Sequence, residues 1–175
     1  MDLKIIKDIL EATQNTCQLH LSYQDSNIDV LHVDSDIETE EGVFDFEPNI
    51  ELLLIPGVQK DLEVGNIMQI FVALPLTDAQ FLEPVKVEMK NFLHLLNFRL
   101  QLGHFGYQVE NDYVYFKYNM LIPLENNEAF KEFIPRTINF IRNVLVNFGG
   151  LIQLVGSGQA TTNQIIAEYF DDQES

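Results

Sequence analysis

The spacing of apolar residues along the chain changes between the period of a helix and that of a strand. An amphipathic helix is predicted first, over residues 3–13, because its apolar residues return every three or four positions. Residues 17–23 and 28–33 then alternate with a period of two on either side of a polar turn, which predicts a β-hairpin. A four-residue loop in this hairpin would pair Leu21 with Val30.

Two strands and a helix are predicted next. Residues 50–56 and 67–75 are apolar runs of strand length, separated by turn-forming residues, and they are typical of inner strands. Thr77 begins a capping-box spacing, and helical periodicity then continues to Asn97. Pro84 would either kink this helix or restart it with the proline in its first turn.

A second hairpin is predicted over residues 103–123. A two-residue turn at Asn111-Asp112 gives its two strands the same alternation of apolar and polar residues. One face would then carry Phe105, Tyr107, Val109, Val114, Phe116 and Tyr118. The opposite face would carry Gln108, Glu110, Tyr113, Tyr115 and Lys117.

The last large element is predicted to be one long helix. Its apolar stripe starts near residues 126–127 and continues at helical steps as far as Val155. Pro135 would kink or restart this helix, and Gly149-Gly150 would weaken it by about 1 kcal/mol per glycine relative to alanine.

A linker and a short tail are predicted after this helix. Residues 156–163 have the composition of a flexible linker. The tail that follows would form a helix with four apolar residues along one side: Ile165, Ile166, Tyr169 and Phe170. We expect this tail to dock on its own domain or on a partner subunit, or else to be inert.

Length and charge limit the class of protein. A chain of 175 residues is long enough for one domain, predicted over residues 1–155, with the linker and tail at 156–175. Its net charge of −17, from 27 acidic and 10 basic residues, would repel phosphate groups and anionic lipids. We therefore expect no nucleic-acid or membrane partner, and favour a basic or unfolded polypeptide. With no apolar run suited to a signal peptide in the amphipathic N-terminal segment, a cytoplasmic protein is expected.

An acidic stretch without Lys or Arg, at residues 32–47, suggests two chemistries. An EF-hand loop starting at Asp34 would need Gly where Thr39 stands and Glu where Asp45 stands. The stretch also resembles the first motif of haloacid dehalogenase-like phosphatases, but Glu38 replaces its Thr or Val and the required βα units are missing. We expect residues 34–47 to form a solvated acidic loop without an ordered metal ion.

The histidines and the cysteine offer no catalytic or metal site in this interpretation. In the predicted register of the first hairpin, His20 and His32 lie on opposite faces of the sheet and cannot bind one metal ion. His94 and His104 are expected at the surface or at caps, and Cys17 as a small, buried apolar residue. Since no nucleophile elbow or phosphate-binding loop is present either, we predict no catalytic residues, no cofactor and no enzymatic activity.

Residues 93–141 carry a resemblance to a known family. A helix ending in Leu96-Asn97 is followed by Gly103 and Phe105, a hairpin, Pro123 and a long amphipathic helix. This pattern resembles the bacterial YbjN family and the structurally related type III secretion chaperones. The predicted order α-β-β-β-β-α-β-β-α, an α+β fold with an antiparallel sheet flanked by helices, looks like that fold apart from one extra early strand.

The resemblance implies a function in protein binding. Type III secretion chaperones are small, acidic, cytoplasmic homodimers that hold a client in an extended state against their sheet. By this resemblance the chain would be a non-catalytic protein-binding module and a homodimer. The alternative is a small-ligand-binding domain with a pocket between the sheet and the long helix.

Two tyrosines are the main candidates for a partner contact. Tyr113 and Tyr115 remain on the outer face of the second hairpin, and Tyr is favoured at interfaces because its ring buries a large area at low entropic cost. The four apolar residues of the tail are further candidates. The opposing interpretation is that both tyrosines lie against a neighbouring helix of the same subunit.

Overall fold

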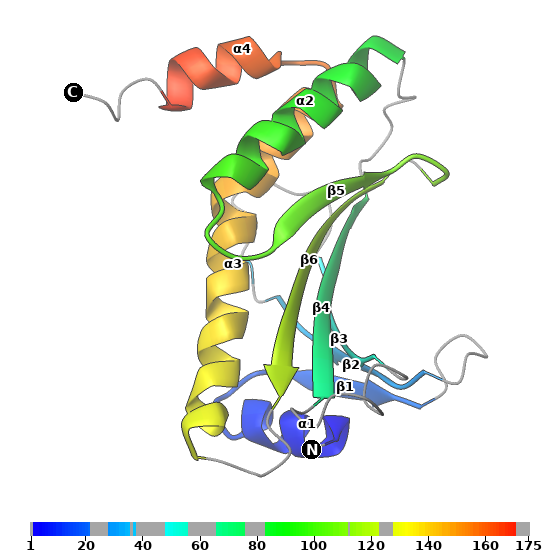
Figure 1. Cartoon of the computed structure of the whole chain (residues 1–175), viewed down its shortest axis with the longest axis vertical. Coiled ribbons are helices and arrows are strands. Elements are labelled where there is room, and N and C mark those ends of the chain that lie inside the picture. The colour runs from blue at the N-terminus through cyan, green and yellow to red at the C-terminus, as the bar shows by residue number, and fades with distance from the viewer. Residues whose placement is uncertain are drawn as a thin grey trace.

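The computed structural model is shown in Figure 1, and it describes residues 2–21, 28–35, 37, 48–55, 66–75, 83–111, 113–122 and 128–170. Most of the predicted acidic loop, at residues 36 and 38–47, lies outside the described residues, as do the predicted capping box at 77–80 and the first hairpin turn.

The elements follow one another in the predicted α+β order. They are α1 (Leu3–Glu11), β1 (Cys17–His20), β2 (Val30–Val33), β3 (Ile50–Leu54), β4 (Asn66–Pro75), α2 (Glu83–Arg99), β5 (His104–Gln108), β6 (Tyr113–Ile122), α3 (Glu128–Gly156), α4 (Thr162–Ile165) and the π-helix η2 (Ile166–Phe170). The fold class predicted from the sequence is therefore confirmed, with α4 and η2 at the place of the predicted tail helix.

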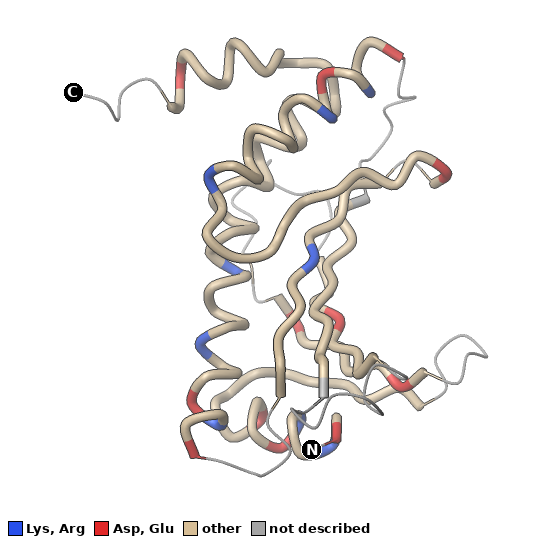
Figure 2. The backbone as a smooth tube through the Cα atoms, viewed as in Figure 1, with Lys and Arg blue, Asp and Glu red and all other residues tan. Residues whose placement is uncertain are grey.

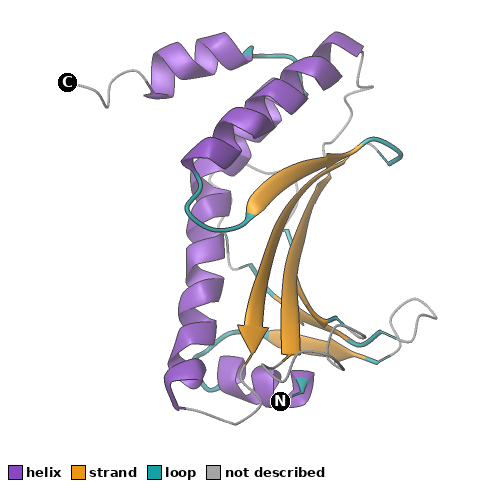
Figure 3. Cartoon of the chain, viewed as in Figure 1, coloured by secondary structure: helices purple, strands orange, loops and turns teal. Residues whose placement is uncertain are grey.

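One antiparallel sheet of six strands organises the described part of the chain. The strand order is β1-β2-β3-β4-β6-β5. β4 and β6 are its longest strands and pair over ten residues each. Figure 3 shows α3 running along one side of the sheet, with α1 near one end of α3 and α2 near the other. No helix in the described ranges lies on the opposite face, called the outer face below.

The core lies between the sheet and the helices. Leu31, Leu52 and Ile70 are neighbours across three strands, and all three are buried. They belong to the same hydrophobic cluster as Ile134 and Ile138 of α3. Burying such side chains is the main favourable term in folding, at roughly 25 cal/mol per Å² of apolar surface.

Helix α3 continues through the residues that were expected to interrupt it. Pro135 lies inside the helix, and Gly149 is among the buried residues of its apolar stripe. α3 is long and apolar enough to span a membrane by length and composition alone, but a core helix passes the same test. In α2 the structure agrees with the second of the two predicted outcomes, because α2 begins at Glu83 and has Pro84 in its first turn.

The register predicted for the first hairpin is wrong by one residue. Val30 pairs with His20 and not with Leu21, and Val33 pairs with Cys17. Because side chains alternate along a strand, a slip of one residue moves every side chain of one strand to the other face. The apolar pattern did not fix the register, because the strand Val30–Val33 has apolar residues at both parities and both Val30 and Leu31 are buried.

The turn predicted for the second hairpin is also wrong, but its faces are correct. Gln108 pairs with Tyr113, which leaves a four-residue connection at 109–112 in place of the two-residue turn. A shift of two residues preserves the alternation, so Phe105 and Phe116 still face the helices. Val109, which was predicted on that face, lies in the connection and is 55% exposed.

Asn97 joins the end of α2 to the edge strand β5. Its side-chain amide donates to the carbonyl oxygen of Phe105 at 2.8 Å, and its oxygen accepts from the backbone N–H of Phe105 at 2.7 Å. The amide thus takes the place of a neighbouring strand for one residue of β5. A short edge strand is fixed in this way against the helix that covers it.

We predict that Asn97→Ala destabilises the fold. The change removes two hydrogen bonds and leaves a part-buried backbone N–H and carbonyl without these partners, at a cost of about 1–3 kcal/mol. Urea unfolding measures this difference. Asn147→Ala, on the exposed side of α3, is the matched control and should change stability by less than about 0.5 kcal/mol. Equal effects of the two substitutions would contradict the role given to Asn97.

Candidate functional site

The outer face of the sheet carries a cluster of aromatic side chains. Tyr115 stacks on Phe71 of β4 with 5.5 Å between ring centroids and 23° between planes. Its edge contacts are with Tyr113, at 6.4 Å, and with His104 of β5, at 6.2 Å. These four residues are called the aromatic cluster below. The two candidate tyrosines therefore lie together, half-buried among residues of the sheet.

Gly106 is the reason that the Tyr115 ring can lie flat over β5. The two residues are direct cross-strand partners. A Cβ atom added to Gly106 would lie 2.3 Å from the Tyr115 ring, far inside contact distance. A glycine without a side chain thus leaves the space that the tyrosine ring occupies, and the ring covers the bare backbone in return.

A continuous row of side chains crosses the outer face from β2 to the edge strand β5. The strand registers place His32, Glu51, Phe71, Lys117 and His104 next to one another in this order. The row connects the aromatic cluster to the histidines of the first hairpin. Three of the four histidines of the chain, all but His94, lie on this face.

The structure overturns the expectation that His20 and His32 lie on opposite faces. Their ring centroids are 4.5 Å apart, with 48° between the planes. The one-residue error in the register explains the difference, because in the observed pairing both residues point to the outer face. His32 Nε2 also lies 3.5 Å from Glu51 Oε1 on the next strand. His20, His32 and Glu51 are called the histidine cluster below.

Partial burial changes the acid–base properties of the histidine cluster. Burial lowers the pKa of His32, and the nearby His20 lowers it further. Burial raises the pKa of Glu51. Both shifts favour the neutral forms, as expected where water is partly excluded. Within the described ranges, no three His, Cys, Asp or Glu side chains have an arrangement that would hold a metal ion.

The outer face is poor in acidic residues although the chain is strongly acidic. In Figure 2 the long central strands are almost entirely free of charged positions. Among the residues that the strand registers place on this face, Glu51 is the one acid and Lys117 the one base. The other acidic residues of the described ranges lie outside the strands, in helices or in connecting and terminal segments.

The tail folds back against α2 of its own chain. Glu88 accepts hydrogen bonds from the backbone N–H of Thr162 at 3.0 Å and from its hydroxyl at 2.8 Å, and these bonds lower the pKa of Glu88. Ile165 is 1% exposed within the core cluster. Phe170 packs under Arg99, whose guanidinium carbon lies 4.3 Å from the ring centroid.

The other two candidates of the tail are less buried. Ile166 is half-buried and Tyr169 is 46% exposed. The connection before the tail is a hydrogen-bonded turn in the region predicted as a flexible linker. Gly158, with φ of +72°, donates to Val155, and Gln159 donates to Leu154, which is the Schellman arrangement at the end of α3.

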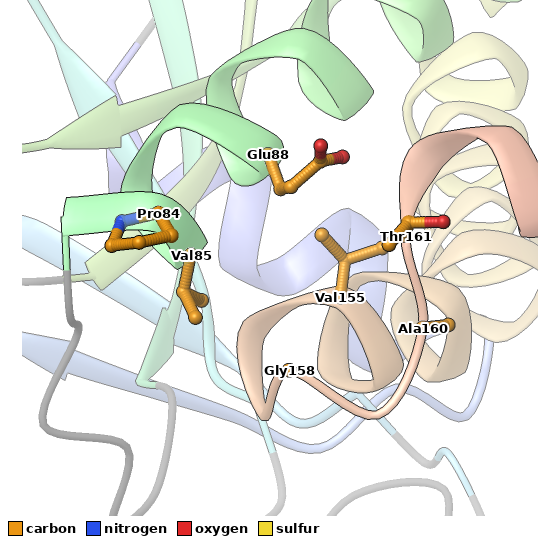
Figure 4. Close-up of a pocket in the computed structure, with 7 residues that line it drawn as sticks. All are labelled: Pro84, Val85, Glu88, Val155, Gly158, Ala160 and Thr161. Carbon is orange, nitrogen blue, oxygen red and sulfur yellow. The ribbon is translucent and has the colours of Figure 1, made fainter.

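A small pocket lies beside this turn (Figure 4). Its volume is about 180 Å³, and it is lined by Pro84, Val85, Glu88, Val155, Gly158, Ala160 and Thr161. The pocket lies between the start of α2 and the end of α3. The pocket predicted from the sequence was expected at a different place, between the sheet and the long helix. Side chains from both of these elements belong to the core cluster.

Cys17 is not activated for thiolate chemistry. Burial raises the pKa of its thiol to about 11, so the thiol is neutral at physiological pH. The side chain packs against the core cluster from β1. Cys17 was predicted to be buried, and it is partly buried.

Sequence reasoning missed several residues of the outer face. Phe71 was predicted to lie in an inner strand but was not assigned to either face of the sheet. His104 was treated as an isolated surface residue. The wrong register hid the histidine cluster. Two exposed apolar residues of α2, Val87 at 53% and Phe98 at 76%, also lay outside the predicted stripe. The periodic signal is weak there because α2 has apolar residues on opposite sides.

Comparisons with known proteins give no match, whether with protein-family models, with curated proteins or with solved structures.

We predict that Ile165→Ala destabilises the domain by about 2–4 kcal/mol, since it removes a fully buried aliphatic side chain and leaves a cavity. Tyr169→Ala, in the exposed part of the same tail, should change stability by less than about 0.5 kcal/mol. Thermal and urea unfolding of both variants check this difference. An unchanged stability of Ile165→Ala would mean that the tail is inert.

We also predict that Glu51→Gln stabilises the fold at about pH 8. The folded-state pKa of Glu51 is raised above its unfolded value, so the carboxylate costs stability above the folded-state pKa, and this cost disappears as the pH falls toward the unfolded value. The melting temperature of the variant should exceed that of the wild type at about pH 8, and the difference should shrink toward zero at about pH 4. A lower melting temperature at about pH 8 would show that His32 or another neighbour stabilises the carboxylate.

Proposed function

We propose that this protein is a non-catalytic protein-binding module that holds a polypeptide partner on the outer face of its sheet. The observation that carries the proposal is the aromatic cluster, half-buried on a face that no described helix covers. It agrees with the function implied by the resemblance to YbjN-like proteins and type III secretion chaperones.

The composition of the outer face is typical of the centre of a protein interface. Such centres are enriched in aromatic residues and depleted of charged ones. Tyr113 and Tyr115 offer ring surface together with hydroxyl groups that tolerate water. Leu121, on the same face and exposed, adds apolar surface beyond the aromatic cluster. A partner would bury these side chains without having to remove water from many charges.

Charge supports an unfolded or basic polypeptide as the partner. The acidic residues outside this face attract a basic chain over a distance of about 8 Å at physiological ionic strength. Close contact then takes place on a face with little charge of its own. This division lets long-range attraction and apolar contact act on the same partner, with Glu51 as the one carboxylate that the strand registers place on the contact face.

The alternative function, binding of a small ligand, has weaker support. Small-molecule pockets usually measure about 300–1,000 Å³. The pocket beside α2 is smaller, and the turn at Gly158 and Ala160 forms part of its wall. The side chains of the sheet and of α3 that face each other belong to the core cluster.

A homodimer in the cytoplasm is part of the proposal, as the resemblance implies. Support comes from α2, where Val87, Asn91, His94 and Phe98 follow one another at helical spacing on its exposed side. None of the four is an acidic residue, a lysine or an arginine. Two copies of a chain with net charge −17 repel each other least at a surface without acidic residues.

The test of the proposed function is binding of an unfolded polypeptide. Fluorescently labelled lysozyme, reduced and carbamidomethylated so that it cannot refold, is titrated with the protein and followed by anisotropy. We predict that Tyr113→Ser with Tyr115→Ser weakens binding by at least about tenfold, as for loss of interface hot spots.

The matched control for this experiment is Phe133→Ser, an exposed aromatic residue on α3 away from the sheet. It should bind as the wild type does. Thermal melting shows whether each variant is folded, and sedimentation measures whether subunits remain associated. Absence of binding by the wild type, or equal binding by the folded double variant, would reject the outer face as the partner site.

A further inference from the structure

The histidine cluster lies where a bound partner would exclude water. The row across the sheet leads from His32 through Glu51 to Phe71, the stacking partner of Tyr115. A polypeptide that covers the aromatic cluster therefore lies next to the histidines. The His32 side chain is already only 17% exposed before any partner is bound.

Exclusion of water opposes the charged form of an imidazole. Burial and the contact with His20 already lower the pKa of His32 in the free protein. A partner that removes more water extends this effect, so the complex binds protons less tightly than the free protein. Association then releases protons, and by linkage its affinity falls as the pH falls through the pKa values of the free histidines.

We infer that the outer face binds its polypeptide partner while His20 and His32 are neutral and releases it on mild acidification. This inference rests on the proposed function and adds its regulation. A basic partner acts in the same direction, because imidazolium groups on the outer face repel it.

The groups that face the histidine cluster determine how strong the effect is. Gln18 and Val30, the cross-strand partners of His32 and His20, are neutral. Glu51 opposes the effect because its carboxylate, 3.5 Å from His32, stabilises an imidazolium. Lys117, beyond Phe71 in the same row, favours neutral imidazoles. Two imidazoles in contact also disfavour double protonation.

The experiment measures the affinity for the same unfolded lysozyme at about pH 7.5 and about pH 6.0. The affinity of the wild type should fall by no more than about fourfold for each histidine that must lose its proton, which is the limit for an unperturbed imidazole. The lowered pKa of His32 makes its share smaller. The double variant His20→Asn with His32→Asn should show a smaller pH dependence than the wild type. Phe133→Ser, the exposed residue of α3 used as the control above, should keep the wild-type dependence.

Titrating groups of the probe affect all variants equally and cancel in this comparison. If the double variant does not fold, His20→Asn alone replaces it and should reduce the pH dependence. NMR titration of the imidazole C–H resonances supplies an independent measure, since the pKa of His32 must fall further on binding. The same pH dependence in wild type and double variant overturns the inference and leaves the proposed function intact. Absence of binding at both pH values overturns the proposed function, and this inference with it.

Discussion

The ten-residue pairing of β4 with β6 is the constraint on which the rest of the structure depends. It sets side by side two strands that are distant in sequence, and it fixes which of their side chains face the helices. Val72 and Phe116 pair on the core side, whereas Phe71 and Lys117 pair on the outer side. Core and candidate site are thus two faces of one hydrogen-bonded ladder, and neither can change register without the other.

The same constraint explains how far the sequence predicts this protein. Element order and fold class follow from apolar periodicity, which is strong in α1, α3 and the strands. The predicted faces of the second hairpin are correct although its turn is wrong, because an error of two residues keeps Tyr113 and Tyr115 on the same face. The predicted faces of the first hairpin are wrong because its register is in error by one residue. The contact of His20 with His32 was therefore not predicted. A strand that is buried on both faces near Val30 carries no alternation from which its register could be determined.

Other parts of the site depend on contacts that no local pattern encodes. The stacking of Phe71 on Tyr115 joins strands separated by α2 and β5 in the sequence. The space above Gly106 has meaning only once Tyr115 is known to lie opposite. Asn97 was part of the family resemblance, yet its two hydrogen bonds to Phe105 appear only when α2 and β5 are placed together. Cross-strand and helix-to-strand contacts are therefore the information that the structure adds.

In the proposed function, attraction of a partner over a distance and close contact with it depend on different parts of the molecule. A net charge of −17 would make every surface of this protein repel its own copies and other acidic proteins if the acids were spread evenly. The outer face instead has Glu51 and Lys117 as its charged residues, among neutral and aromatic neighbours. Three of the four histidines also lie on this face, and burial together with the nearby His20 lowers the pKa of His32. A face with few fixed charges thus carries most of the imidazoles of the chain, and this follows from which residues the ladder turns outward.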